Sequence, residues 1–251
     1  TMKDTIDDFL KHLKIEEDSG YKCGKCRDTG YLIRKGLAVP CTCGKAKKGL
    51  PPKLEKIYLK DFNLKYYPKE LINPERGKES YHDKAQRLLS AAMDFVQGVV
   101  ERRRNLKGLF ITGPIGSGKT HLVSGIYNEL KRLDQEVIFF VVPDLMEQAK
   151  ADMFGEGAGR DVFAKAKKAK ILILDDLGAH NYTPWVINQL YTLFNYRMNN
   201  NLITIITTNL TLEEIDYKLD ERIASRILEL CDSYSLNVDV DIRYKKNIRK
   251  K

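Results

Sequence analysis

The chain has 251 residues, 43% of them hydrophobic, and a formal net charge of +9. This length accommodates one ordinary domain plus a small additional module. No apolar run approaches the ~18 residues of a membrane helix. Acidic residues also interrupt the apolar pattern of the N-terminal "TMKDTIDDFLKHL". We therefore expect neither a membrane span nor a secretory signal, but a cytoplasmic protein.

The basic residues are concentrated at the two ends of the chain. Residues 1–60 contain 14 Lys/Arg against 8 Asp/Glu, and residues 241–251 contain 6 against 1. Residues 61–240, by contrast, contain 23 against 25. A nearly neutral centre with basic ends suggests contact with a polyanion through the extremities. The alternative is that short basic tails only aid solubility.

Four of the five cysteines lie near the N-terminus, as C-x2-C, then fourteen residues, then C-x-C. Two pairs of thiolates beside glycines suit a tetrahedral structural Zn²⁺ ion, with His12 as a reserve ligand. Disulfides are the alternative, which the expected lack of a secretion signal disfavours. Since so short a segment buries little core by itself, a metal would stabilise it. We predict that residues 1–60 form a zinc-binding module with the ligands Cys23, Cys26, Cys41 and Cys43.

We assign residues 61–80 to a linker and residues 81–251 to a second domain. Pro68 and Pro74 interrupt regular structure in the linker. Several aromatic residues in and before it are apolar enough that we expect them to pack across the second domain. These residues are Tyr58, Phe62, Tyr66 and Tyr67.

A nucleotide-binding motif follows a helical pattern that runs from Tyr81 to about Arg104. A short apolar strand, Leu109 to Thr112, leads into "GPIGSGKT", which matches G-x-x-x-x-G-K-T in its strand-loop-helix context. Backbone N–H groups of such a loop surround phosphate oxygens, and the N-terminus of the following helix adds partial positive charge. We expect Lys119 to reach the β- and γ-phosphates of ATP, and Thr120 to ligate Mg²⁺. The predicted nucleotide-binding residues are Gly113, Pro114, Ile115, Gly116, Ser117, Gly118, Lys119, Thr120 and His121.

Two further apolar runs predict buried parallel strands, "EVIFFVV" and "KAKILILDDLG". The second ends in two acids. Asp175, at the strand end, is expected to hold Mg²⁺ together with Thr120, as the corresponding aspartate of phosphoryl-transfer enzymes does. Asp176 would point elsewhere and orient or deprotonate the attacking water.

The rest of the chain continues the alternation of helices and strands. Thr183 is predicted to cap a helix that starts at Pro184, and Thr211 with Glu214 forms a capping box for a short helix. Between them, "LITIITTNL" predicts a fourth strand that ends at Asn209, whose side chain would lie beside the γ-phosphate. The alternation predicts an α/β fold with a central parallel sheet and a ligand site at the strands' C-terminal ends.

A helix is also predicted over "LDERIASRILELC", residues 219–231. Its two arginines, Arg222 and Arg226, are four positions apart and therefore share one face. The ordinary interpretation of such a pair is a solvated basic edge.

Four motifs, "GPIGSGKT", "ILILDDLG", "IITTNL" and "ERIASRI", occur in this order at compatible intervals. Together they resemble the AAA+ ATPases of the helicase-loader group, the DnaC/DnaI type, and the related IstB-like transposition helpers. The resemblance covers roughly residues 55–245. The cysteine-rich module resembles the metal-binding, helicase-contacting domain of DnaI-type loaders. The resemblance implies an AAA+ P-loop fold, ATP and Mg²⁺ as cofactors, and a replicative hexameric helicase as partner.

The resemblance also implies roles for three arginines. Arg226 matches an arginine finger that would reach the γ-phosphate on a neighbouring subunit, and Arg222 would support that interface or that same phosphate. The chain is therefore expected to form an oligomer. Arg243, in "VDVDIRYKK", would sense nucleotide in its own subunit. Because Asp176 stands where the wider superfamily often has glutamate, hydrolysis is expected to be slow.

Loaders of this group carry an insertion between the second and third strands that lines a path for single-stranded DNA. The matching segment here is basic, and its Phe154 and Phe163 would stack on bases. The alternative is that Phe163, with Leu145 and Met146, packs under the sheet. The tail "RYKKNIRKK" is a second candidate for phosphate attraction. The predicted DNA-binding residues are Lys150, Arg160, Lys165, Lys167 and Lys168.

The sequence therefore predicts an ATP-dependent loader of the replicative helicase. An IstB-like transposition helper on duplex DNA is the nearest alternative. A zinc- and nucleotide-dependent DNA-binding regulator without turnover is another. A generic P-loop kinase is disfavoured, because no acceptor-substrate pocket is indicated.

Overall fold

The structure is a computed structural model that describes residues 31–34, 37–40, 50–70, 79–153, 162–178, 182–239 and 241–244. The four predicted zinc ligands and His12 lie outside the described residues, as do Phe154, Arg160 and the tail from residue 245. The zinc prediction therefore stays a prediction. In the N-terminal region, β1 (Tyr31–Arg34) pairs antiparallel with β2 (Leu37–Pro40).

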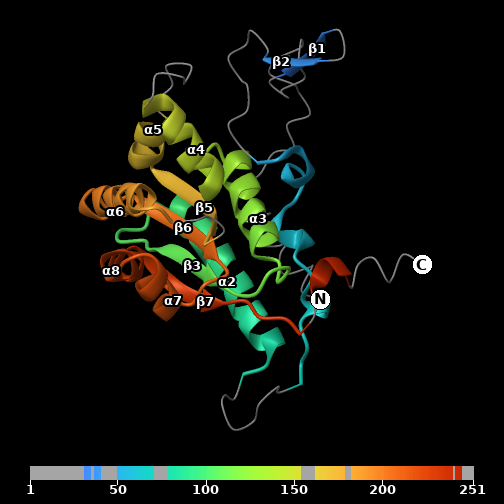
Figure 1. The fold of residues 1–251 in the computed structure, drawn as a ribbon. Coiled ribbons are helices and arrows are strands. Elements are labelled where there is room, and N and C mark those ends of the chain that lie inside the picture. Colours follow the sequence, from blue (N-terminus) through green and yellow to red (C-terminus); the bar gives the residue numbers. More distant parts are fainter. Residues whose placement is uncertain are drawn as a thin grey trace.

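Within the described residues, a second sheet has five strands in the order β4-β5-β6-β3-β7. Every neighbouring pair in it is parallel, as predicted (Figure 1). The fifth strand was not predicted from the sequence. The strands are β3 (Gly108–Thr112), β4 (Val137–Val141), β5 (Ile171–Leu177), β6 (Ile203–Thr208) and β7 (Cys231–Ser235).

Helices cover both faces of this sheet, and side chains of the strands alternate between two apolar cores. Leu109 and Ile111 of β3 pack in the core under α2 and α3, whereas Phe110 packs in the core under α4 to α8. The helices are α2 (Tyr81–Val100), α3 (Lys119–Arg132), α4 (Val142–Met153), α5 (Val162–Lys168), α6 (Pro184–Asn199), α7 (Leu212–Lys218) and α8 (Glu221–Leu230).

The helix starts follow the capping residues in the sequence. Thr183 accepts a hydrogen bond from the backbone of Val186 at the start of α6, and Thr211 forms a capping box with Glu214 at the start of α7. Both were predicted. The end of α8 differs by one residue, because Cys231 leaves the helix and begins β7.

A short segment before α2 belongs to the same core. Residues 50–67, which we call the wall segment, contain three short 3₁₀ turns: η1 (Pro52–Leu54), η2 (Leu59–Asp61) and η3 (Leu64–Tyr66). Leu50 and Leu59 are buried in the core with α2 and α3. Both residues lie within the range 1–60 that the sequence assigns to the N-terminal module, and both pack in the core that α2 and α3 cover.

One buried cation ties α5, α6 and β6 together. The guanidinium of Arg197, on α6, is fully buried. It donates to the carbonyl oxygens of Ala166 and Ala169 at 2.8 Å each, and to that of Ile203 at 2.6 Å. Its Nε donates to the hydroxyl of Thr204 at 2.8 Å. Since unpaired carbonyls at a helix end are costly to bury, Arg197 stabilises the end of α5 against the sheet.

Across the part of the chain that the structure describes, no helix has both the length and the apolar content needed to cross a bilayer.

Candidate nucleotide site

The loop between β3 and α3 depends on three glycines in the left-handed region of backbone space. Gly113, Gly116 and Gly118 have φ angles of 153°, 75° and 100°. A Cβ atom at Gly116 would collide with the carboxylate of Asp241, and one at Gly118 would lie 2.8 Å from the hydroxyl of Tyr67. Both positions therefore need glycine for conformation and for space.

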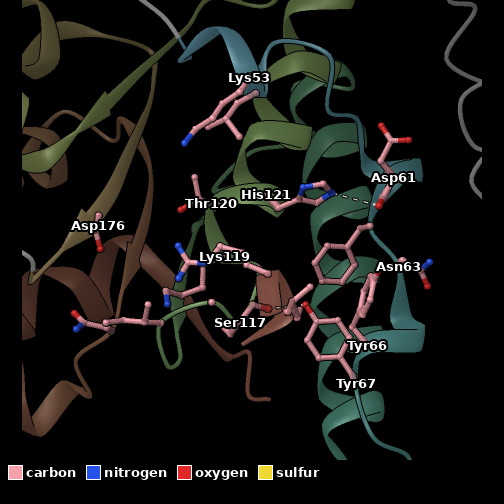
Figure 2. A pocket seen from close by; sticks show the side chains of 18 residues that line it. Lys53, Asp61, Asn63, Tyr66, Tyr67, Ser117, Lys119, Thr120, His121 and Asp176 are labelled. Atoms are coloured by element: carbon pink, nitrogen blue, oxygen red, sulfur yellow. Dashed lines mark hydrogen bonds between the residues drawn. The ribbon is translucent and has the colours of Figure 1, made fainter. Parts of the chain in front are cut away.

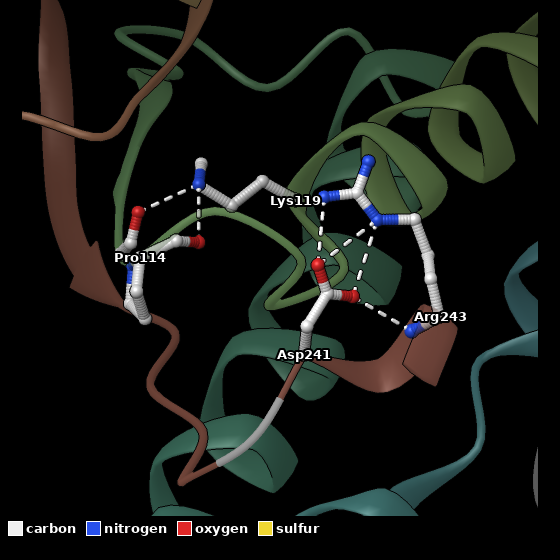
Figure 3. A network of polar contacts seen from close by, with 5 residues as sticks. Pro114, Lys119, Asp241 and Arg243 are labelled. Atoms are coloured by element: carbon white, nitrogen blue, oxygen red, sulfur yellow. Dashed lines mark hydrogen bonds and ion pairs between the residues drawn. The ribbon is translucent and has the colours of Figure 1, made fainter. Parts of the chain in front are cut away.

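Lys119, the first residue of α3, lies inside this loop with 8% of its surface exposed. Its Nζ donates to the carbonyl oxygens of Gly113 at 2.6 Å and Pro114 at 2.9 Å (Figure 3). Burial lowers the pKa of Lys119, and the nearby carboxylates of Asp176 and Asp175 oppose that shift. The amine is thus held at the loop, where we expected it to meet phosphate.

Asp175 lies at the C-terminal part of β5 and is only 3% exposed. It accepts a hydrogen bond from the hydroxyl of Thr120 at 2.9 Å and one from the hydroxyl of Thr207, on β6, at 2.6 Å. Burial raises the pKa of Asp175, and these two hydrogen bonds oppose the rise. The structure therefore brings together Thr120 and Asp175, the predicted Mg²⁺ ligands. It also adds Thr207, which was not predicted.

The side chain of Asp176 points in a different direction from that of Asp175, as expected. Its φ is 65°, and the pairing register of β5 with β6 shifts between Leu174 and Leu177. The backbone N–H of Asp176 donates to Thr207 at 3.0 Å, and its exposed side chain lines a cavity together with Asn209. The local bulge thus buries one acid and presents the next one at the cavity.

The cavity has a volume of about 600 Å³, within the range of small-molecule sites. Figure 2 shows the side chains around it. The predicted residues in its lining are Ile115, Gly116, Ser117, Gly118, Lys119, Thr120, His121, Asp176, Asn209 and Arg243. Eight lining residues were not predicted as site residues: Lys53, Leu54, Asp61, Phe62, Asn63, Tyr66, Tyr67 and Ile242.

Seven of these eight come from the wall segment, which forms an aromatic side of the cavity. The rings of Phe62 and Tyr67 stack with centroids 5.5 Å apart and planes 25° from parallel. Phe62 also faces His121 at 6.5 Å, and a ring nitrogen of His121 lies 3.3 Å from the carbonyl oxygen of Asp61. Phe62 and Tyr67 pack on the second domain, as predicted. Nothing in the spacing of the aromatic residues indicated that they would also line a cavity.

Arg243 reaches the cavity from a short turn near the C-terminus. Its Nη2 and Nε donate to the carboxylate of Asp241 at 2.8 Å and 3.1 Å (Figure 3). The pair lowers the pKa of Asp241. The backbone N–H of Ile242 donates to the carbonyl oxygen of Gly116 at 3.1 Å, so this turn is attached to the phosphate-binding loop.

Arg222 and Arg226 lie on one face of α8, as predicted, and that face looks onto α6. Arg222 pairs with Asp220 at 2.8 Å and lies 4.8 Å from the ring centroid of Tyr191. Arg226 donates through Nε to Asn195 at 3.2 Å. Neither arginine is among the described residues that line the cavity.

The described basic residues of the insertion lie on α4 and α5. Lys150 is exposed near the end of α4, and Lys165 and Lys168 are exposed on α5. Lys167 is half-buried, with its Nζ 4.7 Å from the ring centroid of Tyr196. Phe163 packs against the core under α4 to α8, which favours its structural interpretation over base stacking.

Known proteins resemble this chain in sequence and structure. The phage-like element PBSX protein XkdC of Bacillus subtilis is 28% identical over 234 residues, covering 86% of this chain and 82% of that protein. The replicative helicase loader DnaI of Bacillus subtilis is 28% identical over 125 residues, covering 49% of this chain and 40% of DnaI. A crystal structure of DnaI superposes with a TM-score of 0.58 at 25% identity, covering 74% of this chain and 94% of that one.

The family assignment follows from a match over most of the chain. Residues 81–249 match the sequence profile described as IstB-like ATP binding protein. This range contains the phosphate-binding loop, the acidic strand end and the paired arginines. The chain therefore belongs to the IstB-like ATP-binding proteins, a family of AAA+ ATPases related to the DnaI and DnaC helicase loaders.

Proposed function

We propose that this protein is an ATP-dependent loader of a replicative DNA helicase. The observation that carries the proposal is the cavity that Lys119 and Thr120 of the phosphate-binding loop line at one end of a parallel sheet, with the Thr120 hydroxyl bonded to the buried Asp175. The similarity to DnaI supports the helicase as partner, although the chain spans less than half of that loader.

The loop and the start of α3 would bind the phosphates of ATP through backbone N–H groups, with Lys119 exchanging its carbonyl partners for phosphate oxygens. The adjacent oxygens of Thr120 and Asp175 fit the hard-oxygen ligation that Mg²⁺ prefers. When bound there, Mg²⁺ neutralises charge on the phosphates. The stacked Phe62 and Tyr67 offer a flat apolar wall for the base.

For hydrolysis, Asp176 would orient water at the γ-phosphate from the cavity side, and Asn209 would lie beside that phosphate and sense it. Arg243 would leave Asp241 to contact phosphate in its own subunit. Arg226, supported by Arg222, would complete the site of a neighbouring subunit, so the active form would be an oligomer. A cation supplied in this way stabilises negative charge in the transition state.

The lysines of α4 and α5 would bind the phosphates of single-stranded DNA, together with Arg160. The N-terminal module, with Zn²⁺ bound by its four cysteines, would engage the helicase. Residues 81–251 would then couple ATP and DNA binding to the opening or release of the helicase ring.

The experiment that tests this function is fluorescence anisotropy with labelled single-stranded and duplex oligonucleotides, with and without ATP, at one fixed salt concentration. We expect ATP-dependent preference for single strands. A matched charge-reversal variant, Lys165→Glu with Lys168→Glu, should lose that binding while keeping ATP affinity. Absence of binding to either form would show that the isolated chain does not bind DNA.

An IstB-like helper ATPase of transposition is the second candidate, favoured by the family match over residues 81–249. Equal or tighter binding of duplex DNA in the same titration would support it. A regulator that uses ATP only as an assembly signal would bind DNA but show no turnover at any DNA concentration.

A further inference from the structure

The wall segment follows α3 from the phosphate-binding loop to its last turn. The side-chain amide of Asn128 donates to the carbonyl oxygens of Leu54 at 2.9 Å and Ile57 at 2.6 Å. A Cβ atom at Gly125 would lie 3.0 Å from the backbone nitrogen of Leu59. This close packing gives the segment a fixed position on α3 and brings its last residue, Tyr67, to the loop.

The contact between Tyr67 and the loop is a buried hydrogen bond. The hydroxyl of Tyr67 donates to the carbonyl oxygen of Ser117 at 2.7 Å, and the tyrosine is 3% exposed (Figure 2). The residues are 50 positions apart, so the bond joins the wall segment to the centre of the glycine-rich motif.

The geometry of a peptide bond gives this contact a consequence for phosphate binding. The carbonyl of Ser117 and the N–H of Gly118 belong to one planar trans peptide, so they point to opposite sides of the chain. A hydrogen bond that holds the carbonyl toward Tyr67 therefore directs the N–H of Gly118 away from Tyr67. Backbone N–H groups are what a loop of this type offers to phosphate oxygens.

We propose that Tyr67 is a positioning residue of the phosphate-binding loop, which fixes the Ser117–Gly118 peptide in the orientation that presents the Gly118 N–H to the nucleotide phosphates. The inference goes beyond the proposed function in naming this residue, and it depends only on the nucleotide-binding part of that function.

Two neighbours hold the tyrosine in place for this role. Its ring stacks on Phe62 at 5.5 Å, and its hydroxyl occupies the space that the missing Cβ of Gly118 leaves. Burial raises the pKa of Tyr67 far above its ordinary range, so the hydroxyl keeps its proton and remains a donor. A Ser117–Gly118 peptide that rotated freely would lose conformational entropy when nucleotide binds. A peptide already fixed by Tyr67 does not incur this cost.

A different role for the same residue makes a different prediction. If Tyr67 acts only as part of the aromatic wall for the base, its hydroxyl is dispensable and any effect of the residue appears with adenosine as well. If it positions the loop, the hydroxyl affects ligands that carry phosphates and leaves adenosine unaffected.

The test is Tyr67→Phe in the full chain, which retains the ring and removes only the hydroxyl. Tyr127→Phe is the matched control, because that half-buried tyrosine lies on α3, the helix on which the wall segment packs, and contacts Phe139 at 6.0 Å outside the cavity lining. Binding of ATP, ADP and adenosine is measured by competition against a fluorescent ADP analogue. Thermal unfolding of the free protein is measured alongside.

We expect Tyr67→Phe to weaken ADP and ATP binding by about three- to tenfold, the effect of one lost neutral hydrogen bond. Adenosine binding, and the Tyr127→Phe control, should be unchanged. Turnover should show a raised KM with little change in kcat.

Equal weakening for adenosine, or no weakening for ADP, would overturn the proposal. So would a Tyr67→Phe chain that fails to fold, because the hydroxyl would then be a condition of folding rather than of loop geometry. A wild-type chain that binds no ADP would instead remove the proposed nucleotide function.

Discussion

The hydroxyl of Thr207 lies 2.6 Å from Oδ1 of Asp175, across the boundary between the parallel strands β6 and β5. Both side chains are buried, so the hydrogen bond is not exchanged for one to water. Thr207 also accepts the backbone N–H of Asp176 at 3.0 Å. One threonine therefore orients the proposed metal ligand and the backbone of the acid that follows it.

Replacement of Thr207 by valine should weaken Mg²⁺-dependent ATP binding. Valine keeps the shape of threonine but leaves Asp175 with one hydrogen bond fewer, and loss of a partner of this kind typically costs about 10–100-fold in metal affinity. The measurement is ATP affinity across a Mg²⁺ titration. Thr208→Val is the control, since the Thr208 hydroxyl, in the same strand, accepts from the backbone of Leu210 instead. Equal losses in both variants would contradict a specific role.

The same variant should change the pH profile. Burial raises the pKa of Asp175, so its ionised, metal-binding form is lost as the pH falls through that raised pKa. The hydrogen bond from Thr207 opposes the rise. Without it, the acid limb of Mg²⁺-dependent turnover should move to higher pH than in the wild type. A limb at the same pH in both proteins would show that Asp175 does not govern it.

The features that could be predicted from the sequence are those whose pattern lies within a few neighbouring positions of the chain. The glycines of the loop, Lys119, and the pair Asp175 and Asp176 form contiguous motifs, and Thr183 and Thr211 precede the helices that they cap. Such features depend on local backbone geometry, so spacing alone identifies them.

What the sequence did not reveal depends on contacts between distant segments. Tyr67 meets Ser117 across 50 positions, and Thr207 meets Asp175 across 32. The aromatic pattern of the wall segment indicated only that it would be buried. The partner of Arg243 lies just two positions away, but the arginine reaches the cavity because the turn that carries it is bonded to Gly116.

Lys119→Ala should abolish ATP binding. The amine lies at the loop and donates hydrogen bonds to two of its carbonyl oxygens. Alanine removes this positive charge from the cavity lining. Isothermal titration with ATP is the measurement. Lys131→Ala is the control, because Lys131 lies on the same helix, 5.7 Å from the Tyr127 ring and outside the cavity lining. An intact affinity in Lys119→Ala would refute nucleotide binding at this loop.

Arg226→Ala should leave ATP affinity intact and reduce turnover. The arginine lies outside the cavity lining of its own chain, and a finger supplied to a neighbour is worth about 10³–10⁵ in rate. Steady-state ATPase assays at several protein concentrations test this. Asn195→Ala removes the partner of Arg226 but keeps the guanidinium, so it should have a much smaller effect. An unchanged rate in Arg226→Ala would show that the finger assignment is wrong.

Arg197→Met should lower the free energy of unfolding by about 3 kcal/mol or more, because methionine fills the space but leaves buried carbonyl oxygens without their donor. Those carbonyls belong to the end of α5, the connection to β5 and the start of β6, so the loss is spread over three elements. Urea unfolding measures it. Arg87→Met is the control, since the exposed pair of Arg87 with Glu79 contributes about 1 kcal/mol at most.

Because α5 carries Lys165 and Lys168, the Arg197 variant should also bind single-stranded DNA less tightly at concentrations of urea where the sheet remains folded. Equal stability in the two variants would mean that water replaces the guanidinium at these carbonyls, and that the basic helix is held to the sheet by its apolar contacts alone.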